Sequence, residues 1–323
     1  MSSDGEATRR QAWTAYWASG RLHSCADASD RNYEGAIGEF WRSHFSQGAG
    51  GTRILDVATG NGPLPSLMHD LLGDAVEIDA VDLSTVAPAW HDPVLHARIQ
   101  FHSGVRIEAL PFGDASFDQV VSQYGFEYAD REAALAECDR VARPNARIAL
   151  VMHHTESVLM KVGREELEHH AWLRTEEGLL VAASNVVPFI ARIREGATPT
   201  SAARAARGFY NQAMAVLAQR AAVSVAPDLL LEARDAIHRL VASVGRDPSP
   251  AIHALQAYAA ELDDARLRTA EMVDHALDDA ALEELSRRFS VLRPDAEISS
   301  CVLRQAEGIV GWAWVAGPSD MAG

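Results

Sequence analysis

The sequence predicts an α/β fold, in which a doubly wound, mostly parallel sheet ends in an antiparallel hairpin and carries an inserted α-helical subdomain. Three observations predict it. Short β-rich runs alternate with helical stretches from residue 52 to 152, a pattern typical of parallel sheets with right-handed crossovers. Alanine-rich helical patterns then fill residues 155–294. Two β-rich runs around a short polar turn close the chain, as in a β-hairpin.

Local patterns place the individual elements. Runs of β-branched and aliphatic residues predict five strands, at 53–58, 76–82, 99–102, 117–122 and 147–152. Apolar residues at helical spacing predict two helices between these strands, at 64–72 and at 131–142, where Pro144 ends the pattern. The clearest helices of the insertion are expected at 201–222 and 229–244, and the hairpin strands at 297–304 and 309–316.

These elements divide the chain into segments with different expected tasks. Residues 1–50 are aromatic-rich and helical, and a glycine run at 48–51 separates this N-terminal cap from the sheet. The sheet domain is expected at 51–154 and 295–323. The helical subdomain at 155–294 follows the fifth strand, so we expect it to emerge on the ligand side as a lid over the substrate pocket. A dimerisation arm, and hence a homodimer, is the alternative.

Composition excludes several classes of function. The chain has 29 Lys and Arg against 45 Asp and Glu, a formal charge of −16, which disfavours nucleic-acid and membrane-surface partners. No apolar run is long enough to span a bilayer, and the start lacks the apolar core of a signal peptide. Cys25, Cys138 and Cys301 form no CxxC pair, and no histidine spacing predicts a metal site. A cytoplasmic protein is therefore expected.

A glycine turn after the first strand is the strongest chemical signal. Asp56 stands at the strand tip, and the run 58–63 reads Ala-Thr-Gly-Asn-Gly-Pro. Such a turn brings backbone close to a ligand at a helix N-terminus, although a tight turn without a ligand has the same sequence. Asp82 ends the second strand, where a carboxylate accepts the hydroxyls of a ribose or caps a helix. The pair of features favours a nucleoside site.

The same turn indicates which nucleoside. Pro65 stands where a dinucleotide-binding fingerprint requires its third glycine, which disfavours an NAD-linked oxidoreductase. Asp56 would repel a pyrophosphate but would suit a cationic ammonium group. S-adenosylmethionine (SAM) carries that ammonium and a ribose, and it has no phosphate.

These residues resemble a known family. Residues 54–62 are similar to the first motif of class I SAM-dependent methyltransferases, and 81–84 to their second. Residues 109–121 resemble a stretch of the small-molecule members related to quinone-biosynthesis methyltransferases. The resemblance covers 52–152 and implies a Rossmann-like methyltransferase fold, with SAM as cofactor and S-adenosylhomocysteine as product. It implies methyl transfer to an O, N or C atom of a small molecule, mainly by positioning, with general-base help if the acceptor enters protonated.

The resemblance also implies roles for matching residues. The first motif would line the methionine moiety, with Ala58 in place of the usual first glycine, and Asp82 would hold the ribose while Leu83 packs on adenine. Arg106 stands where an acidic residue often reads the adenine, so the backbone of Ile107, with Glu108, is expected to do so. The full set of expected cofactor residues is Asp56, Ala58, Gly60, Asn61, Gly62, Asp82, Leu83, Ile107, Glu108, Gln123 and Tyr124.

The ends of the fourth and fifth strands supply the catalytic candidates. Glu127 could face the substrate, with a capping role as the alternative. His153 and His154 end the fifth strand, and since neighbouring side chains on a strand point to opposite faces, one of them is expected to face the site, as a base or as a substrate ligand. Three residues of the N-terminal segment could line the substrate pocket or simply pack: Trp17, His23 and Tyr33. A non-catalytic, SAM-binding regulatory subunit is the alternative function.

Overall fold

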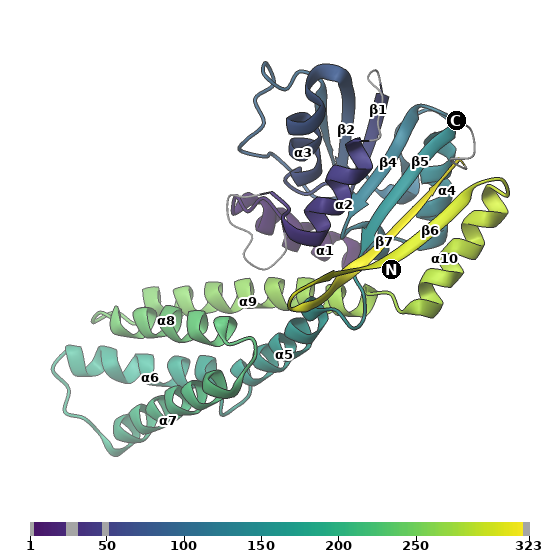
Figure 1. Ribbon diagram of the computed structural model, residues 1–323. Helices are drawn as coiled ribbons and strands as arrows, with labels where there is room; N and C mark the ends of the chain where they lie inside the picture. The colour runs from purple at the N-terminus through teal and green to yellow at the C-terminus, as the bar shows by residue number, and fades with distance from the viewer. Residues whose placement is uncertain (1–2, 24–31, 47–51, 319–323) are drawn as a thin grey trace. The chain divides into compact units, whose positions relative to one another are not determined.

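The computed structural model describes residues 3–23, 32–46 and 52–318 (Figure 1). Cys25 and the glycine run at 48–51 lie outside the described residues. The chain forms two compact units. One comprises Met1–Met160 with Glu271–Gly323, and the other is Lys161–Ala270.

The first unit contains a seven-stranded sheet in the order β3-β2-β1-β4-β5-β7-β6. The pairs among β1 to β5 are parallel, whereas β7 runs antiparallel to both β5 and β6. The strands are β1 Thr52–Val57, β2 Val76–Asp82, β3 Ile99–Ser103, β4 Phe117–Gln123, β5 Ala142–Met152, β6 Glu297–Gln305 and β7 Gly308–Gly317. The predicted fold class is therefore confirmed, including the closing hairpin.

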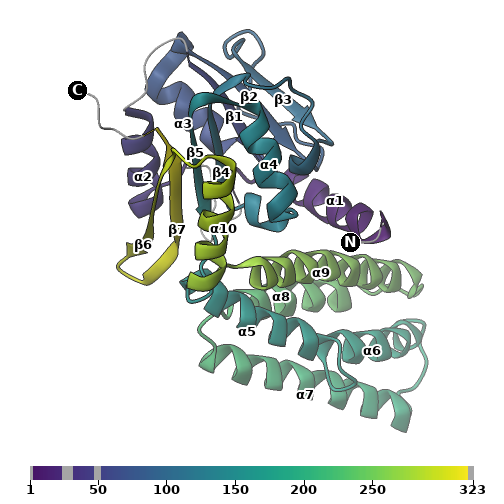
Figure 2. The same ribbon diagram turned by 90° about the vertical axis from the view of Figure 1, so that its right-hand side faces the viewer.

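Helices cover both faces of this sheet because neighbouring strand residues point in opposite directions. Ile54 packs with α2 (Gly35–Ser46) and α3 (Pro63–Leu72), whose buried residues include Trp41 and Met68. Leu55 belongs to the core on the opposite face, with α4 (Arg131–Val141). Figure 2 shows α2 and α4 on opposite sides of the strands. The arrangement is doubly wound, as predicted.

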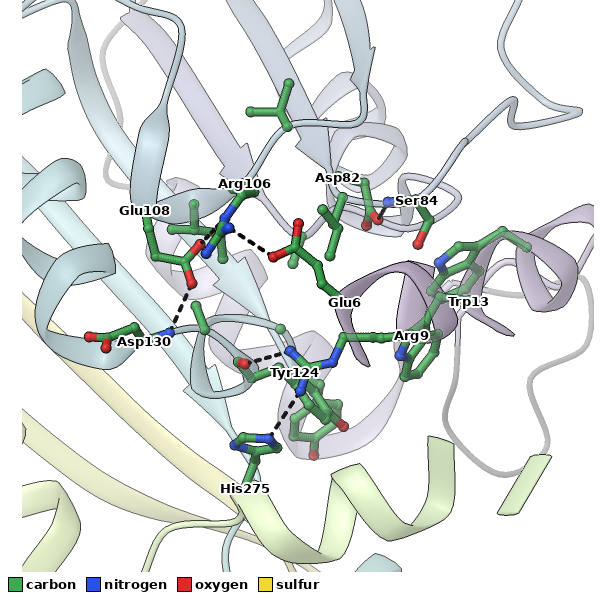
Figure 3. Close-up of a pocket in the computed structure, with 18 residues that line it drawn as sticks. Glu6, Arg9, Trp13, Asp82, Ser84, Arg106, Glu108, Tyr124, Asp130 and His275 are labelled. Atoms are coloured by element: carbon green, nitrogen blue, oxygen red, sulfur yellow. Dashed lines mark hydrogen bonds and ion pairs between the residues drawn. The ribbon is translucent and has the colours of Figure 1, made fainter. Parts of the chain in front are cut away.

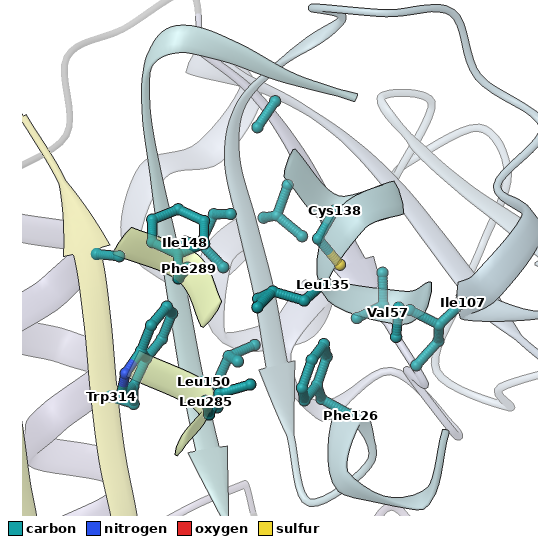
Figure 4. Close-up of a cluster of buried hydrophobic side chains, with 14 of the residues drawn as sticks. Val57, Ile107, Phe126, Leu135, Cys138, Ile148, Leu150, Leu285, Phe289 and Trp314 are labelled. Atoms are coloured by element: carbon teal, nitrogen blue, oxygen red, sulfur yellow. The ribbon is translucent and has the colours of Figure 1, made fainter. Parts of the chain in front are cut away.

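The position of α10 (Asp279–Leu292) differs from the prediction. The sequence placed residues up to 294 in the helical insertion, yet the second unit ends at Ala270 and α10 belongs to the sheet unit. Leu285 and Phe289 of α10 pack with Trp314 of β7 in the core drawn in Figure 4. The reason is that the apolar stripe of α10 covers the end of the sheet where β7 pairs with β5.

Strand β5 begins earlier than predicted, at Ala142, directly after α4. Its register against β4 shifts between Phe117 and Gln119, where three exposed residues of β5 are accommodated. Pro144 is one of them. Since a bulge leaves residues out of the ladder, the missing N–H of Pro144 costs no strand-pairing bond there.

The second unit is all-helical with a core of its own. Its core includes Leu173, Val187, Leu217, Leu230 and Ile237. The helices that contribute are α5 Val158–Leu173, α6 Leu179–Arg194, α7 Ser201–Val223, α8 Asp228–Ala242 and α9 Ser249–His275. The last of them continues into the first unit at Glu271. No helix in the described part of the chain combines the length and apolar character needed to cross a membrane.

Candidate cofactor and acceptor site

A cavity of about 430 Å³ lies at the carboxyl ends of β1 to β4, beside the first helix, α1 (Ser3–Ala18) (Figure 3). Strand β1 has neighbours β2 and β4, so the strand order reverses here, which is where open α/β sheets bind ligands. Residues after the strands form one wall, namely Ala58, Asp82, Leu83, Ser84, Val105, Arg106, Ile107, Glu108, Tyr124, Gly125, Tyr128, Ala129 and Asp130. Helix α1 and the end of α9 add Glu6, Arg9, Trp13, Trp17 and His275.

Asp82 connects the glycine turn to the cavity. Its Oδ2 accepts a hydrogen bond from the backbone N–H of Gly60 at 2.8 Å, and its Oδ1 accepts one from the N–H of Ser84 at 2.7 Å. Burial raises the pKa of Asp82, and these N–H groups oppose that rise. A carboxylate has about four acceptor positions in total, so Asp82 retains capacity for ligand hydroxyls.

Asp56 is a buried carboxyl without a partner. Neither of its oxygens accepts a hydrogen bond from a described residue. Burial raises the pKa of Asp56 to about 8; the nearby Thr59 hydroxyl opposes this shift and the charge of Asp82 adds to it. Because an unsatisfied buried polar group is costly, its presence indicates a ligand site, and a cation would compensate it best.

Helix α1 covers part of the glycine turn that follows β1 and Asp56. A Cβ at Gly60 would come within 2.6 Å of the Trp17 ring, and the Asn61 side-chain amide donates to the carbonyls of Trp17 and Arg21 at 2.9 and 2.7 Å. Gly60 and Gly62 have φ of 56° and 70°, values that favour glycine. The turn therefore fits closely under Trp17 because Gly60 has no side chain there.

The three catalytic candidates lie behind the cavity wall. Glu127 is fully buried and its Oε1 accepts from the backbone N–H of His153 at 2.8 Å. The His153 ring stacks at 4.1 Å on Tyr124, which does line the cavity. His154 stacks on Trp312 at 4.5 Å, and its Nδ1 accepts from the N–H of Glu156. None of the three is among the residues that line the cavity.

Burial shifts the pKa values of His153 and Glu127 in opposite directions. It lowers the pKa of His153 to about 3, so the ring is neutral at physiological pH. It raises the pKa of Glu127 to about 7, against the hydrogen bond from His153. The His153 ring meets two residues of the cavity wall, Tyr124 at 4.1 Å and Tyr128 at 6.0 Å between ring centroids. Tyr124 has a φ of 53°, which is unusual for a non-glycine residue.

The burial of Glu127 predicts a pH-dependent stability. A carboxyl whose pKa is higher folded than unfolded stabilises most at low pH, and the contribution falls as pH rises toward the folded value. From pH 5 to 7, between the ordinary pKa of a glutamate and the folded value of about 7, we expect Glu127 to cost about 2 kcal/mol, since each pKa unit corresponds to about 1.36 kcal/mol. Urea titrations should show this loss in the parent and a flatter profile in Glu127→Gln. The exposed Glu283→Gln should behave as the parent; equal slopes in all three proteins would contradict the expectation.

A family model described as a methyltransferase domain matches residues 55–150. These residues hold the end of β1, all of β2 to β4, most of β5, and all but the α1 and α9 residues of the cavity wall. The sheet unit contains a class I SAM-dependent methyltransferase domain. The resemblance seen in the sequence is thereby confirmed, and SAM is the cofactor of this family.

Relatives of the methyltransferase domain are distant. The ubiquinone/menaquinone biosynthesis C-methyltransferase UbiE of Shewanella sp. (strain W3-18-1) is 28% identical over 124 residues, 36% of this chain and 49% of that protein. UbiE of Teredinibacter turnerae is 26% identical over 159 residues, 46% and 64% respectively. The chain thus spans about half to under two thirds of the curated relatives it matches. Among solved structures, the Haloferax volcanii complex of a methyltransferase with its Trm112 activator shows 24% identity and a TM-score of 0.40, covering 48% of this chain and 66% of that one.

The methyltransferase domain brings part of the predicted cofactor set together. Six of these residues line the cavity, namely Ala58, Asp82, Leu83, Ile107, Glu108 and Tyr124. Four more lie outside its lining: Asp56 in β1, and Gly60, Asn61 and Gly62 in the turn that follows β1. Gln123 is also outside the lining, and its Oε1 accepts from Trp41 Nε1 of α2 at 2.6 Å. Glu108 accepts from the N–H of Asp130 at 3.0 Å.

The predicted substrate residues separate in the same way. Trp17 lines the cavity and stacks on Trp13 at 5.6 Å. His23 and Tyr33 stack on each other at 4.8 Å and are not part of the lining.

Sequence reasoning missed the charged residues that α1 and α9 contribute. Arg9 and His275 line the cavity, as does Glu6, which pairs with Arg106 at 2.8 Å. A signal for them existed. Arg9 and Trp13 are four residues apart in α1, and Glu271 and His275 are four apart in α9, a spacing that puts each pair on one helix face.

Proposed function

We propose that this protein is a SAM-dependent methyltransferase that acts on a small molecule. The observation that carries the proposal is the Asp82 carboxylate, which faces the cavity while holding the N–H of Gly60. Asp82 thus links a carboxylate that can accept the ribose hydroxyls to a glycine turn whose backbone can lie close to a ligand. Acidic residues on the cavity wall, among them Glu108 and Asp130, suit a cationic cofactor without phosphate.

The residues of the site would divide the work as follows. SAM supplies an activated methyl group when bound. Asp82 would bind the ribose hydroxyls, and the unpartnered Asp56 would face the ammonium of the methionine moiety. Trp17 and Trp13 would exclude water from the reacting centre. Holding two reactants in line can lower a barrier by about 7–11 kcal/mol. Alignment of the acceptor with the methyl group is therefore the main catalytic contribution, and a general base is secondary.

Two measurements test the proposal. Calorimetry with SAM should show one saturable site, and labelled SAM incubated with the protein and the small-molecule fraction of a cell extract should pass its label to a small molecule. The alternative, a non-catalytic SAM-binding subunit, is favoured by the position of Glu127, His153 and His154 outside the cavity lining. Binding without label transfer would support that alternative and contradict an enzyme.

The Asp56 carboxyl predicts that SAM binding releases protons. With a pKa of about 8, it is mostly protonated at pH 7, and a neighbouring ammonium would favour its ionised form. We expect release of about one proton per SAM from this group. Calorimetry at pH 7 in buffers of different ionisation enthalpy measures the number. Asp56→Asn should release about one proton fewer; an unchanged count would place the ammonium elsewhere.

The task of the helical unit stays a prediction, either a lid over the substrate or a dimerisation arm. Because α10 packs in the sheet core, a truncation should remove residues 161–270 and not 155–294. Light scattering before and after truncation separates the two roles. A parent that is monomeric at all concentrations rules out the arm.

A further inference from the structure

His275 lines the cavity but has no role in the proposed function. It is the last residue of α9, and it is the only histidine among the described residues that line the cavity. It also lies outside the residues 55–150 that the family model matches. Figure 3 shows its ring beside Arg9 at the end of the cavity away from Asp82.

Arg9 is held firmly at this end of the cavity. Its Nε donates to Glu271 Oε1 at 2.5 Å, its Nη1 donates to the Tyr128 carbonyl at 3.0 Å, and both side chains of the ion pair are largely buried, at 12% and 14% exposed. Trp13 Nε1 donates to the other oxygen of Glu271 at 3.4 Å. Two pairs with i, i+4 spacing, one on each helix, thus interlock and fix the guanidinium beside His275.

This contact defines the state of the His275 ring. Arg9 Nη2 lies 3.4 Å from His275 Nε2. A guanidinium has donors and no acceptor, so Nε2 must carry the lone pair and the ring proton stays on Nδ1. The contact is long for a hydrogen bond, so a better donor entering the cavity can replace it.

The charges around His275 favour its neutral form. Burial lowers the pKa of His275, and the charges of Arg9 and Arg131 lower it further. The carboxylates of Glu271 and Asp274, on the same helix as His275, oppose the shift. The ring therefore stays neutral at physiological pH, with an accepting nitrogen beside a fixed positive charge.

Building on the proposed function, we propose that Arg9 and His275 bind the methyl acceptor through an acidic hydroxyl of a phenol or enol, and that His275 removes its proton. The O–H bond breaks and the proton binds Nε2. The electron pair left on oxygen forms the new bond to the methyl carbon, and the pair of the broken C–S bond stays on sulfur. Arg9 stabilises the developing oxyanion, and Glu271 compensates the second positive charge that appears on His275.

The cavity wall near Arg9 and His275 suits a phenol or enol as the acceptor. Trp13, Tyr124 and Tyr128 line the cavity, and their rings suit a flat, unsaturated molecule. An amine that enters as its ammonium would instead meet the charge of Arg9. The arrangement favours an acceptor that loses a proton over one that carries a positive charge.

Labelled SAM supplied with phenols of graded acidity, and in parallel with matched aryl amines, tests the proposal. Label should enter the phenols. In His275→Gln, kcat/KM should fall by ~10²–10⁴-fold near neutral pH, with SAM affinity unchanged. The loss should shrink as pH rises, since the acceptor then ionises without a base. His253→Gln, an exposed position on the same helix, is the matched control and should keep the parent rate.

A second variant tests the pairing independently. Arg9→Gln removes a charge that lowers the pKa of His275, so the acidic limb of kcat/KM should move to higher pH. Two outcomes would overturn the role of His275: methylation of amines only, or methylation of phenols with an unchanged pH profile in both variants. In either case SAM binding and methyl transfer would still support the proposed function. Absence of SAM binding in calorimetry would refute the proposed function itself, and this inference with it.

Discussion

Replacing Asp82 with alanine is expected to weaken SAM binding by ~100-fold or more. Two ribose hydroxyls that donate to a carboxylate contribute about 1.5 kcal/mol each at the low end of charged hydrogen bonds, and ~1.4 kcal/mol corresponds to a factor of ten in affinity. The substitution has a second effect. It removes the acceptor that holds the N–H groups of Gly60 and Ser84, so the glycine turn keeps the hydrogen bond from Thr59 N–H to the Val81 carbonyl but loses the one from Gly60.

Calorimetric titration with SAM measures this loss. Asp82→Asn keeps one accepting oxygen, so its affinity should lie between those of the parent and the alanine variant. Asp70→Ala, an exposed carboxylate of α3, controls for a general change in charge and should bind as the parent does. If Asp82→Ala binds SAM with parental affinity, the cavity is not the nucleoside site and the proposed function loses the observation that carries it.

Much of the fold was predictable because the local residue patterns indicate the same strands and helices that the sheet requires. The run that predicted β2 at 76–82 matches the strand residue for residue, because its apolar residues are buried on both faces: Val76 and Ile78 in one core and Val81 in the other. The prediction that Asp82 and the glycine turn meet needed only the rule that parallel strands end at one edge. The Asp82 to Gly60 hydrogen bond shows that meeting directly.

Other features depend on partners that the sequence does not reveal. The spacing of Leu282, Leu285 and Phe289 predicts a helix, but not whether it packs on other helices or on the sheet. Pro144 was predicted only to end the preceding helix, and the register shift between β4 and β5 accommodates it within β5. Trp17 over Gly60, and Arg9 beside His275, are contacts between segments far apart in the chain. His153 and His154 lie outside the cavity lining and stack on Tyr124 and Trp312, which are likewise contacts that the sequence does not reveal.

Replacing Phe289 with alanine is expected to destabilise the sheet unit by about 3–5 kcal/mol, the usual cost of deleting a buried aromatic ring. Phe289 is 1% exposed and meets Trp314 of β7 edge to face, with ring centroids 5.4 Å apart. The neighbouring hydrogen bond from Trp314 Nε1 to Ser286 Oγ, at 2.9 Å, fastens the same helix to the same strand. The cavity left behind would lie in the main core of the first unit.

Denaturant unfolding followed by the near-UV signal of the tryptophans measures this effect, and Val291→Ala is the matched control. Val291 lies two residues away on α10 and is 75% exposed, so its truncation should change the free energy of unfolding by less than about 0.5 kcal/mol. The comparison decides to which unit α10 belongs. If α10 belonged to the helical insertion, removing the Phe289 ring would leave the sheet unit as stable as in the parent. If α10 belongs to the sheet core, the substitution lowers the unfolding midpoint of the sheet unit. SAM binding then weakens only in proportion to the fraction of unfolded protein.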